Sequence, residues 1–106
     1  MKVLFDQGTP APLRRVLASH LVETAYERGW SCLQKGELIA VAEAAGFTVL
    51  VTTDKNLKYQ QNLAARTLSI VVLLTTSWPR IQRSLPAVLE AVDEAVPGGY
   101  VEVSIE

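Results

Sequence analysis

Cysteine and histidine each occur only once in this chain of 106 residues, as Cys32 and His20. A single cysteine excludes an intramolecular disulfide and a cysteine-rich zinc site, and a single histidine excludes a histidine-rich metal site within one chain. The chain also lacks an excess of either charge, since 10 basic and 11 acidic residues leave a formal net charge of −1. This balance argues against a non-specific nucleic-acid coat protein, although it permits a local basic patch.

Long hydrophobic runs are missing as well. The apolar runs, such as residues 70–74, are far too short to cross a bilayer. The residues after Lys2 lack the apolar region of a signal peptide, so we expect a cytoplasmic protein without a membrane partner. Hydrophobic residues make up 49% of the chain and charged residues 20%, which is the balance of a single folded domain over residues 1–106. A homodimer that buries part of this apolar surface stays open.

Short apolar runs alternate with longer amphipathic segments, a pattern typical of α/β proteins. The apolar runs predict strands at residues 3–5, 20–23, 47–53, 68–74 and 100–105. Helices are predicted from about residue 10, over 24–28, 37–45 and 55–63, and from residue 78 onward. Thr9 is a candidate cap for the first helix, and Pro86 must kink or restart the last one. Helical crossovers between buried strands predict a three-layer α/β fold, with a mostly parallel sheet of about five strands between helices.

Two acidic residues directly follow predicted strands, Asp6 after the first and Asp54 after the strand at 47–53. Because ligands bind outside the carboxyl ends of parallel strands, both carboxylates are expected at one edge of the sheet. Glu37 lies at the boundary between the apolar and polar faces of its helix and can lean over that edge, whereas Glu43 should face solvent. Three carboxylates without histidine or cysteine suit Mg²⁺ or Mn²⁺, ions that support phosphodiester hydrolysis.

Simpler explanations of the same residues stay open. Asp6 precedes Gly8 in a turn-forming sequence, and Asp54 is suited to cap the helix that follows it. Glu37 in a first helical turn is favoured by the helix dipole alone.

A polar, basic stretch follows Asp54 and supplies most of the candidate contacts to RNA. The candidates, with one residue from the first helix, are Lys55, Lys58, Tyr59, Arg66 and Arg14. Basic side chains pair with phosphates and an aromatic ring stacks on a base. A solvated helix face is the alternative, and Trp30 and Trp78 are more typical of a core or an interface.

Three segments together resemble the short PIN-like proteins related to VapC toxins. They are residues 3–10 (VLFDQGTP), residues 36–47 (GELI followed by AEAAGF), and residues 49–63 (VLVTTDKNL followed by YQQNL). The resemblance covers about residues 1–75 and keeps the spacing between the segments. It implies a single PIN-like domain with the ancestry of a metal-dependent ribonuclease. The toxin of a toxin–antitoxin pair, with RNA as substrate and an antitoxin as protein partner, is the role it suggests.

The resemblance also implies roles for the acidic residues. Asp6, Asp54 and Glu37 match the residues that hold Mg²⁺ or Mn²⁺ and act in catalysis in PIN domains. PIN domains usually carry a fourth carboxylate, whereas this chain offers only Asn56 and the hydroxyl residues at 75–77. A catalytically degenerate module that binds RNA or protein is therefore the alternative.

A phosphoacceptor receiver domain is a third interpretation, because Asp54 follows a central strand. Receiver domains need an acidic pair after the first strand, and here Gln7 follows Asp6. This difference argues against the receiver interpretation.

Overall fold

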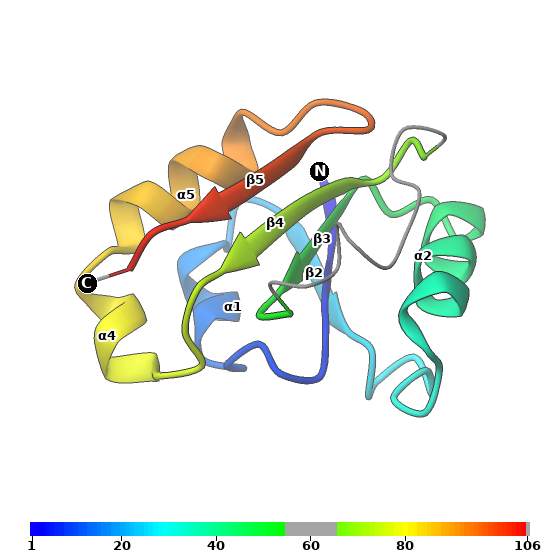
Figure 1. Ribbon diagram of the computed structural model, residues 1–106, viewed down its shortest axis with the longest axis horizontal. Coiled ribbons are helices and arrows are strands. Elements are labelled where there is room, and N and C mark those ends of the chain that lie inside the picture. The colour runs from blue at the N-terminus through cyan, green and yellow to red at the C-terminus, as the bar shows by residue number, and fades with distance from the viewer. Residues whose placement is uncertain (55–65, 106) are drawn as a thin grey trace.

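The computed structural model describes residues 1–54 and 66–105, and Figure 1 shows their arrangement. The strands are β1 (Lys2–Phe5), β2 (Leu21–Thr24), β3 (Val49–Thr52), β4 (Ser69–Leu73) and β5 (Tyr100–Val103). The helices in these ranges are α1 (Leu13–Val16), α2 (Lys35–Ala44), α4 (Trp78–Gln82) and α5 (Leu85–Asp93). Every predicted strand is thus confirmed to within a few residues. The helix predicted at 55–63 lies outside the described residues.

The five strands form one sheet in the order β2-β1-β3-β4-β5, and every neighbouring pair is parallel. After β1 the chain adds β2 on one side, then returns to place β3, β4 and β5 on the other. The order therefore reverses between β1 and β3. In open parallel sheets a ligand site is expected at this reversal, outside the carboxyl ends of the two strands.

Helices cover both faces of the sheet, as the three-layer prediction requires (Figure 1). Val3 and Phe5 of β1 point to the face that packs against α1, α4 and α5. Leu4, between them, points to the face that packs against α2. The same alternation in β3 and β4 gives two apolar layers, because successive strand residues point to opposite faces. The architecture is compatible with the fold that the resemblance implies.

The helix predicted at 24–28 is wrong, because Thr24 ends β2 and residues 25–29 form a turn. The backbone N–H of Thr24 donates to Glu27 Oε1 at 3.0 Å, and the N–H of Glu27 donates to Thr24 Oγ1 at 3.1 Å. These reciprocal bonds close a single turn, which ends at Gly29 with a φ of 76°. Side chains of Thr and Glu thus satisfy the backbone locally, where a helix would need a longer run.

Two proline and capping predictions have different outcomes. Thr9 does not cap α1, because its Oγ1 donates to the carbonyl of Val51 at 2.8 Å and the helix begins after Pro12. Pro86 does separate two helices, since α4 ends at Gln82 and α5 begins at Leu85, with Pro86 in its first turn. Proline fits there because backbone N–H groups in the first turn have no partner within the helix, so the N–H that proline lacks is not missed.

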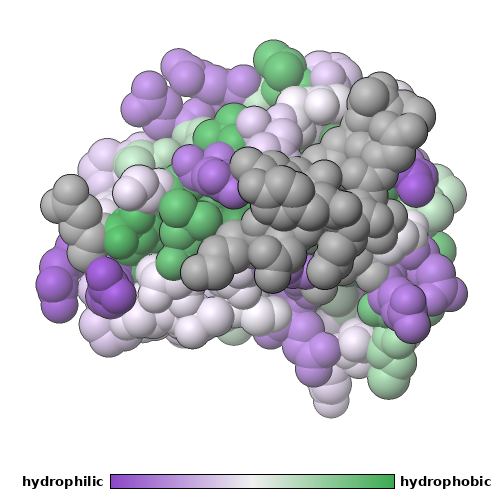
Figure 2. Space-filling model, viewed as in Figure 1, coloured by the Kyte–Doolittle hydropathy of each residue, from purple (hydrophilic) through white to green (hydrophobic). Residues whose placement is uncertain are grey.

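β5 forms one edge of the sheet, as its alternating sequence predicts. Val101 on this strand is 42% exposed, whereas Val103 is buried. Figure 2 shows hydrophobic surface over the part of the molecule that β5 crosses, interrupted by hydrophilic residues. The homodimer stays a prediction.

Within the described ranges, no helix has the length and the apolar character needed to span a bilayer.

Candidate functional site

A cleft of about 450 Å³ lies at the carboxyl ends of β1 and β3, where the strand order reverses. Asp6 and Asp54 both contribute to its lining, so these two predicted site residues come together. The other lining residues are Gln7, Gly8, Ala25, Trp30, Ser31, Leu33, Leu38 and Thr53. The cleft lies on the α2 face of the sheet, because Leu38 belongs to α2 and Ala25 to the same apolar cluster.

Strand register places Asp6 beside Thr52. Phe5 pairs with Val51, so the next residues along each strand lie opposite each other and point to the same face. The backbone N–H of Asp6 extends the ladder by donating to the Val51 carbonyl at 3.0 Å. The position of Asp6 is therefore set by the sheet itself.

The hydroxyl of Thr52 connects the two aspartates. Thr52 is fully buried, and its Oγ1 donates to Asp6 Oδ2 at 2.6 Å. The same oxygen accepts a hydrogen bond from the backbone N–H of Asp54 at 3.1 Å. Asp6 Oδ1 in turn accepts from the N–H of Gln7 at 2.6 Å. These bonds orient the Asp6 carboxylate, which is 7% exposed, before any ligand binds.

The loop after β1 packs closely against the end of β3. A Cβ atom added to Gly8 would lie 2.5 Å from Thr53 Oγ1, so a larger residue cannot fit without a shift. Both residues line the cleft. Glycine at this position thus lets the backbone approach the neighbouring strand and shapes the cleft.

Glu37 lies in the first turn of its helix, as predicted, but outside the lining of the cleft. It is exposed in the first turn of α2, and its Oε1 accepts a 3.4 Å hydrogen bond from the backbone N–H of Gln34. The two residues form a capping box at the start of the helix. Its neighbour Leu38 lines the cleft, but Glu37 is not among the lining residues. A catalytic or metal-binding role for Glu37 stays a prediction from the resemblance.

The donor set of the cleft suits one hard cation. The two aspartates, with Thr53 and Gln7 also in the lining, are residues whose side chains carry the oxygen ligands that Mg²⁺ and Mn²⁺ prefer. No group of three His, Cys, Asp or Glu residues is arranged to hold a metal ion in the described part of the chain. Residues 55–65 contain none of these four residue types. The arrangement therefore favours a site with two carboxylates, whose remaining ligands are water and substrate, over a two-metal site.

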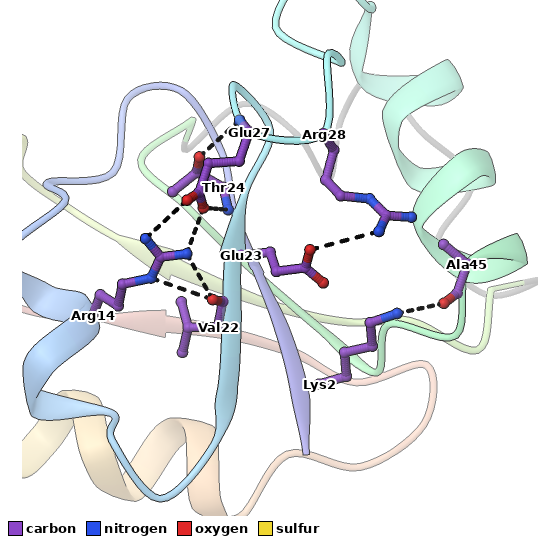
Figure 3. A network of polar contacts seen from close by, with 8 residues as sticks. All are labelled: Lys2, Arg14, Val22, Glu23, Thr24, Glu27, Arg28 and Ala45. Carbon is purple, nitrogen blue, oxygen red and sulfur yellow. Dashed lines mark hydrogen bonds and ion pairs between the residues drawn. The ribbon is translucent and has the colours of Figure 1, made fainter.

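Arg14, a predicted phosphate contact, is engaged in a structural network (Figure 3). Its guanidinium donates to the Val22 carbonyl at 2.8 and 3.2 Å, and it forms an ion pair with Glu27. The hydrogen bond to Glu27 raises the pKa of Arg14, and the same bond lowers the pKa of the Glu27 carboxyl. The network attaches α1 to the end of β2.

Arg66 lies far from the cleft along the strand direction. It precedes the amino end of β4, whereas Asp6 follows the carboxyl end of β1, and the strands are parallel. The structure therefore does not bring Arg66 together with Asp6 and Asp54. The remaining candidates for RNA contact, Lys55, Lys58 and Tyr59, lie outside the described residues.

The prediction that Glu43 is a solvated charge is wrong. Its Oε2 accepts hydrogen bonds from the backbone N–H of Thr67 at 2.6 Å and of Leu68 at 3.1 Å, and Arg66 pairs with its Oε1 at 3.2 Å. Partial burial opposes ionisation, but these hydrogen bonds together outweigh it and lower the pKa of Glu43. Glu43 thus holds the segment that leads into β4.

Two further residues act at the site in ways that the sequence does not show. The polar segment from Thr52 onward is expected to flank the same edge of the sheet, but the hydrogen bond from Thr52 to Asp6, 46 positions away, depends on the tertiary structure. Trp30 reads as a core residue, and it does pack on the core, but it also lines the cleft.

Comparisons with family models, with curated proteins and with solved structures returned no match for this chain.

Proposed function

We propose that this chain is a metal-dependent ribonuclease of the PIN-like type, in which Asp6 and Asp54 hold one Mg²⁺ or Mn²⁺. The observation that carries the proposal is that both aspartates line one cleft at the reversal of strand order. Reversal points of parallel sheets are where such folds place their ligands. The sequence resemblance to VapC-related proteins supports RNA as the substrate and extends the proposal to the toxin of a toxin–antitoxin pair.

The chain's own contribution is to fix the ligands in place. The Thr52 hydroxyl and the backbone N–H of Gln7 donate hydrogen bonds to the Asp6 carboxylate. The same hydroxyl accepts a hydrogen bond from the backbone N–H of Asp54. A ligand set held in advance loses little entropy when it binds a cation. When bound, the ion would lower the pKa of a water molecule and stabilise negative charge on the phosphorus oxygens. Two carboxylates are enough for Mg²⁺, which usually keeps several water molecules and completes its shell with substrate phosphate.

A degenerate PIN-like module that binds RNA or protein is the second candidate. The specific observation in its favour is the donor count, since the described residues arrange no third acidic ligand and residues 55–65 contain none. Such a module would bind its partner equally well with and without divalent metal.

The test is the cleavage of mixed single-stranded RNA by purified wild type, Asp6→Asn, Asp54→Asn and Glu90→Gln. All three variants remove one negative charge, and Glu90 is an exposed residue of α5 on the opposite face of the sheet. Asparagine fits at position 6 because the Thr52 hydroxyl can accept a hydrogen bond as well as donate one. Circular dichroism verifies that each variant is folded.

The proposal predicts cleavage by wild type and Glu90→Gln in Mn²⁺ and none in chelator. Loss of a residue that only hydrogen-bonds to a metal ligand already lowers metal affinity or activity about 10–100-fold. Loss of a ligand itself, Asp6 or Asp54, should therefore reduce the rate of cleavage about 100-fold or more. Full cleavage by Asp6→Asn would refute the proposed site. Metal-independent RNA binding without cleavage would favour the degenerate module.

A further inference from the structure

The cleft has an apolar part that the proposed metal chemistry does not use. It comes from the segment between β2 and α2, which contributes Ala25, Trp30 and Leu33, and from Leu38 of α2. The polar part comes from the loops after β1 and β3. A ligand that fills the whole cleft must therefore present a flat or apolar group next to a cation or next to an anion that a cation binds to the two aspartates.

Among the described residues, Trp30 is the one aromatic residue in this lining, and several contacts hold it in place. The backbone N–H of Trp30 donates to the Ala25 carbonyl at 2.8 Å, and its backbone carbonyl accepts a hydrogen bond from the N–H of Leu33 at 3.1 Å. The indole packs edge-to-face on Phe47, with ring centroids 6.0 Å apart and an interplanar angle of 74°. Phe47 is itself buried at 4% exposure. A half-buried ring that is fixed in this way provides contact area at a low entropic cost.

A positively charged side chain, Arg28, lies against the Trp30 ring. The Arg28 guanidinium lies 4.7 Å from the centroid of Trp30, and its Nη1 pairs with Glu23 Oε1 at 3.5 Å. Figure 3 shows Arg28 and Glu23 directed toward each other beside the end of β2. Arg28 is not among the residues that line the cleft, so its role is to hold the ring by a cation–π contact rather than to contact the RNA backbone.

We infer that Trp30 forms a base-binding subsite, in which a nucleobase of single-stranded RNA packs against the indole while its neighbouring phosphate lies at Asp6 and Asp54. This inference rests on the proposed function for the identity of the anionic half. A volume of about 450 Å³ falls within the range of small-ligand sites, roughly 300–1,000 Å³. Single strands are required because the bases of a duplex are stacked on each other and cannot reach the ring.

The test uses the fluorescence of Trp30. The chain has two tryptophans, so a Trp78→Phe variant reports on Trp30 alone without any change in the cleft. This variant is titrated, with Ca²⁺ in place of Mn²⁺ so that a cation can bridge the phosphate and the aspartates, with a short single-stranded oligoadenylate and with the same strand annealed to its complement. The single strand should quench the fluorescence saturably, and the duplex should quench it far less. An unchanged fluorescence on binding of the single strand would overturn the inference.

Substitution at Trp30 gives a second, independent measurement. Stacking contributes about 1–3 kcal/mol per base, so Trp30→Leu should weaken binding of labelled oligoadenylate about 5- to 150-fold. Trp30→Phe, which keeps an aromatic ring, should restore most of the affinity. Equal affinity in wild type and a folded Trp30→Leu would refute the subsite.

The outcomes separate this inference from the proposed function. Quenching by single-stranded RNA together with no cleavage by any variant would leave the base subsite standing and refute the nuclease. Cleavage that depends on Asp6, with neither quenching nor an effect of Trp30→Leu, would leave the nuclease standing and refute the base subsite. Neither cleavage nor quenching by single-stranded RNA, with every variant folded, would overturn both.

Discussion

Replacement of Thr52 by valine tests whether one hydroxyl holds the two aspartates in place. Valine has nearly the same shape, so the fully buried site is expected to keep its packing. The hydroxyl, however, donates to Asp6 Oδ2 at 2.6 Å and accepts from the Asp54 N–H at 3.1 Å. Both bonds are lost in the variant, and the carboxylate that loses its donor is 7% exposed.

The expected loss of stability follows from the charged partner. A hydrogen bond to a charged group contributes about 1.5–3 kcal/mol, and the loss of the second bond adds somewhat less. We therefore expect the free energy of unfolding to fall by about 2–4 kcal/mol in total. For a domain of this size the melting temperature should drop by roughly 8–16 °C, at about 4 °C per kcal/mol.

Urea unfolding followed by circular dichroism measures this loss, and an unchanged m-value indicates that the denatured state is not altered. Thr48→Val is the matched control, because Thr48 also uses its hydroxyl in a hydrogen bond, to the Lys2 carbonyl at 3.2 Å, but is exposed. The control should change stability by less than about 0.5 kcal/mol. Equal effects of the two substitutions would refute the reasoning that Thr52 anchors the site.

Two further substitutions test the loop beside the cleft and the support of β4. Gly8→Ala should destabilise the protein by about 1–3 kcal/mol, because its Cβ would lie 2.5 Å from Thr53 Oγ1, and Thr53→Ala in the same chain should recover much of the loss. A double-mutant cycle of unfolding free energies with no coupling would contradict this. Since the folded-state pKa of Glu43 lies below its ordinary value of 4.5, the ionised carboxylate adds stability above about pH 4.5 that is lost as the pH falls through the folded-state pKa. The stability difference between wild type and Glu43→Gln should therefore shrink on acidification, and a pH-independent difference in urea titrations would be inconsistent with it.

The sequence was sufficient to predict the layers of this fold. Continuous apolar runs identify β3 and β4 as strands buried on both faces, and alternation identifies β5 as an edge. The order of strands in the sheet could not be derived from these patterns, because it depends on long-range pairing. The turn at 24–28 was missed because one turn and one short helix have the same local sequence signals, and only the Thr24–Glu27 hydrogen bonds distinguish them.

The candidate site was predictable in part. Asp6 and Asp54 could be placed at one edge because both follow strands of a parallel sheet. Whether Glu37 reaches the cleft could not be predicted, because its angle on the helix defines the face it lies on but not the group that its carboxylate contacts. In the structure that group is the backbone N–H of Gln34 at the start of the helix. Thr52 and Glu43 act through partners that are more than 20 positions away in the chain. Such contacts arise from the tertiary structure and leave no local pattern.

Direct binding of Mn²⁺ tests the central claim that Asp6 and Asp54 share one cation. The electron paramagnetic resonance signal of unbound Mn²⁺ is measured during titration of wild type, Asp6→Asn, Asp54→Asn and Glu90→Gln. We predict one Mn²⁺ per chain for wild type and Glu90→Gln, with affinity lowered about tenfold or more in each aspartate variant. Wild-type affinity in Asp6→Asn, or no binding by the wild type, would contradict the account.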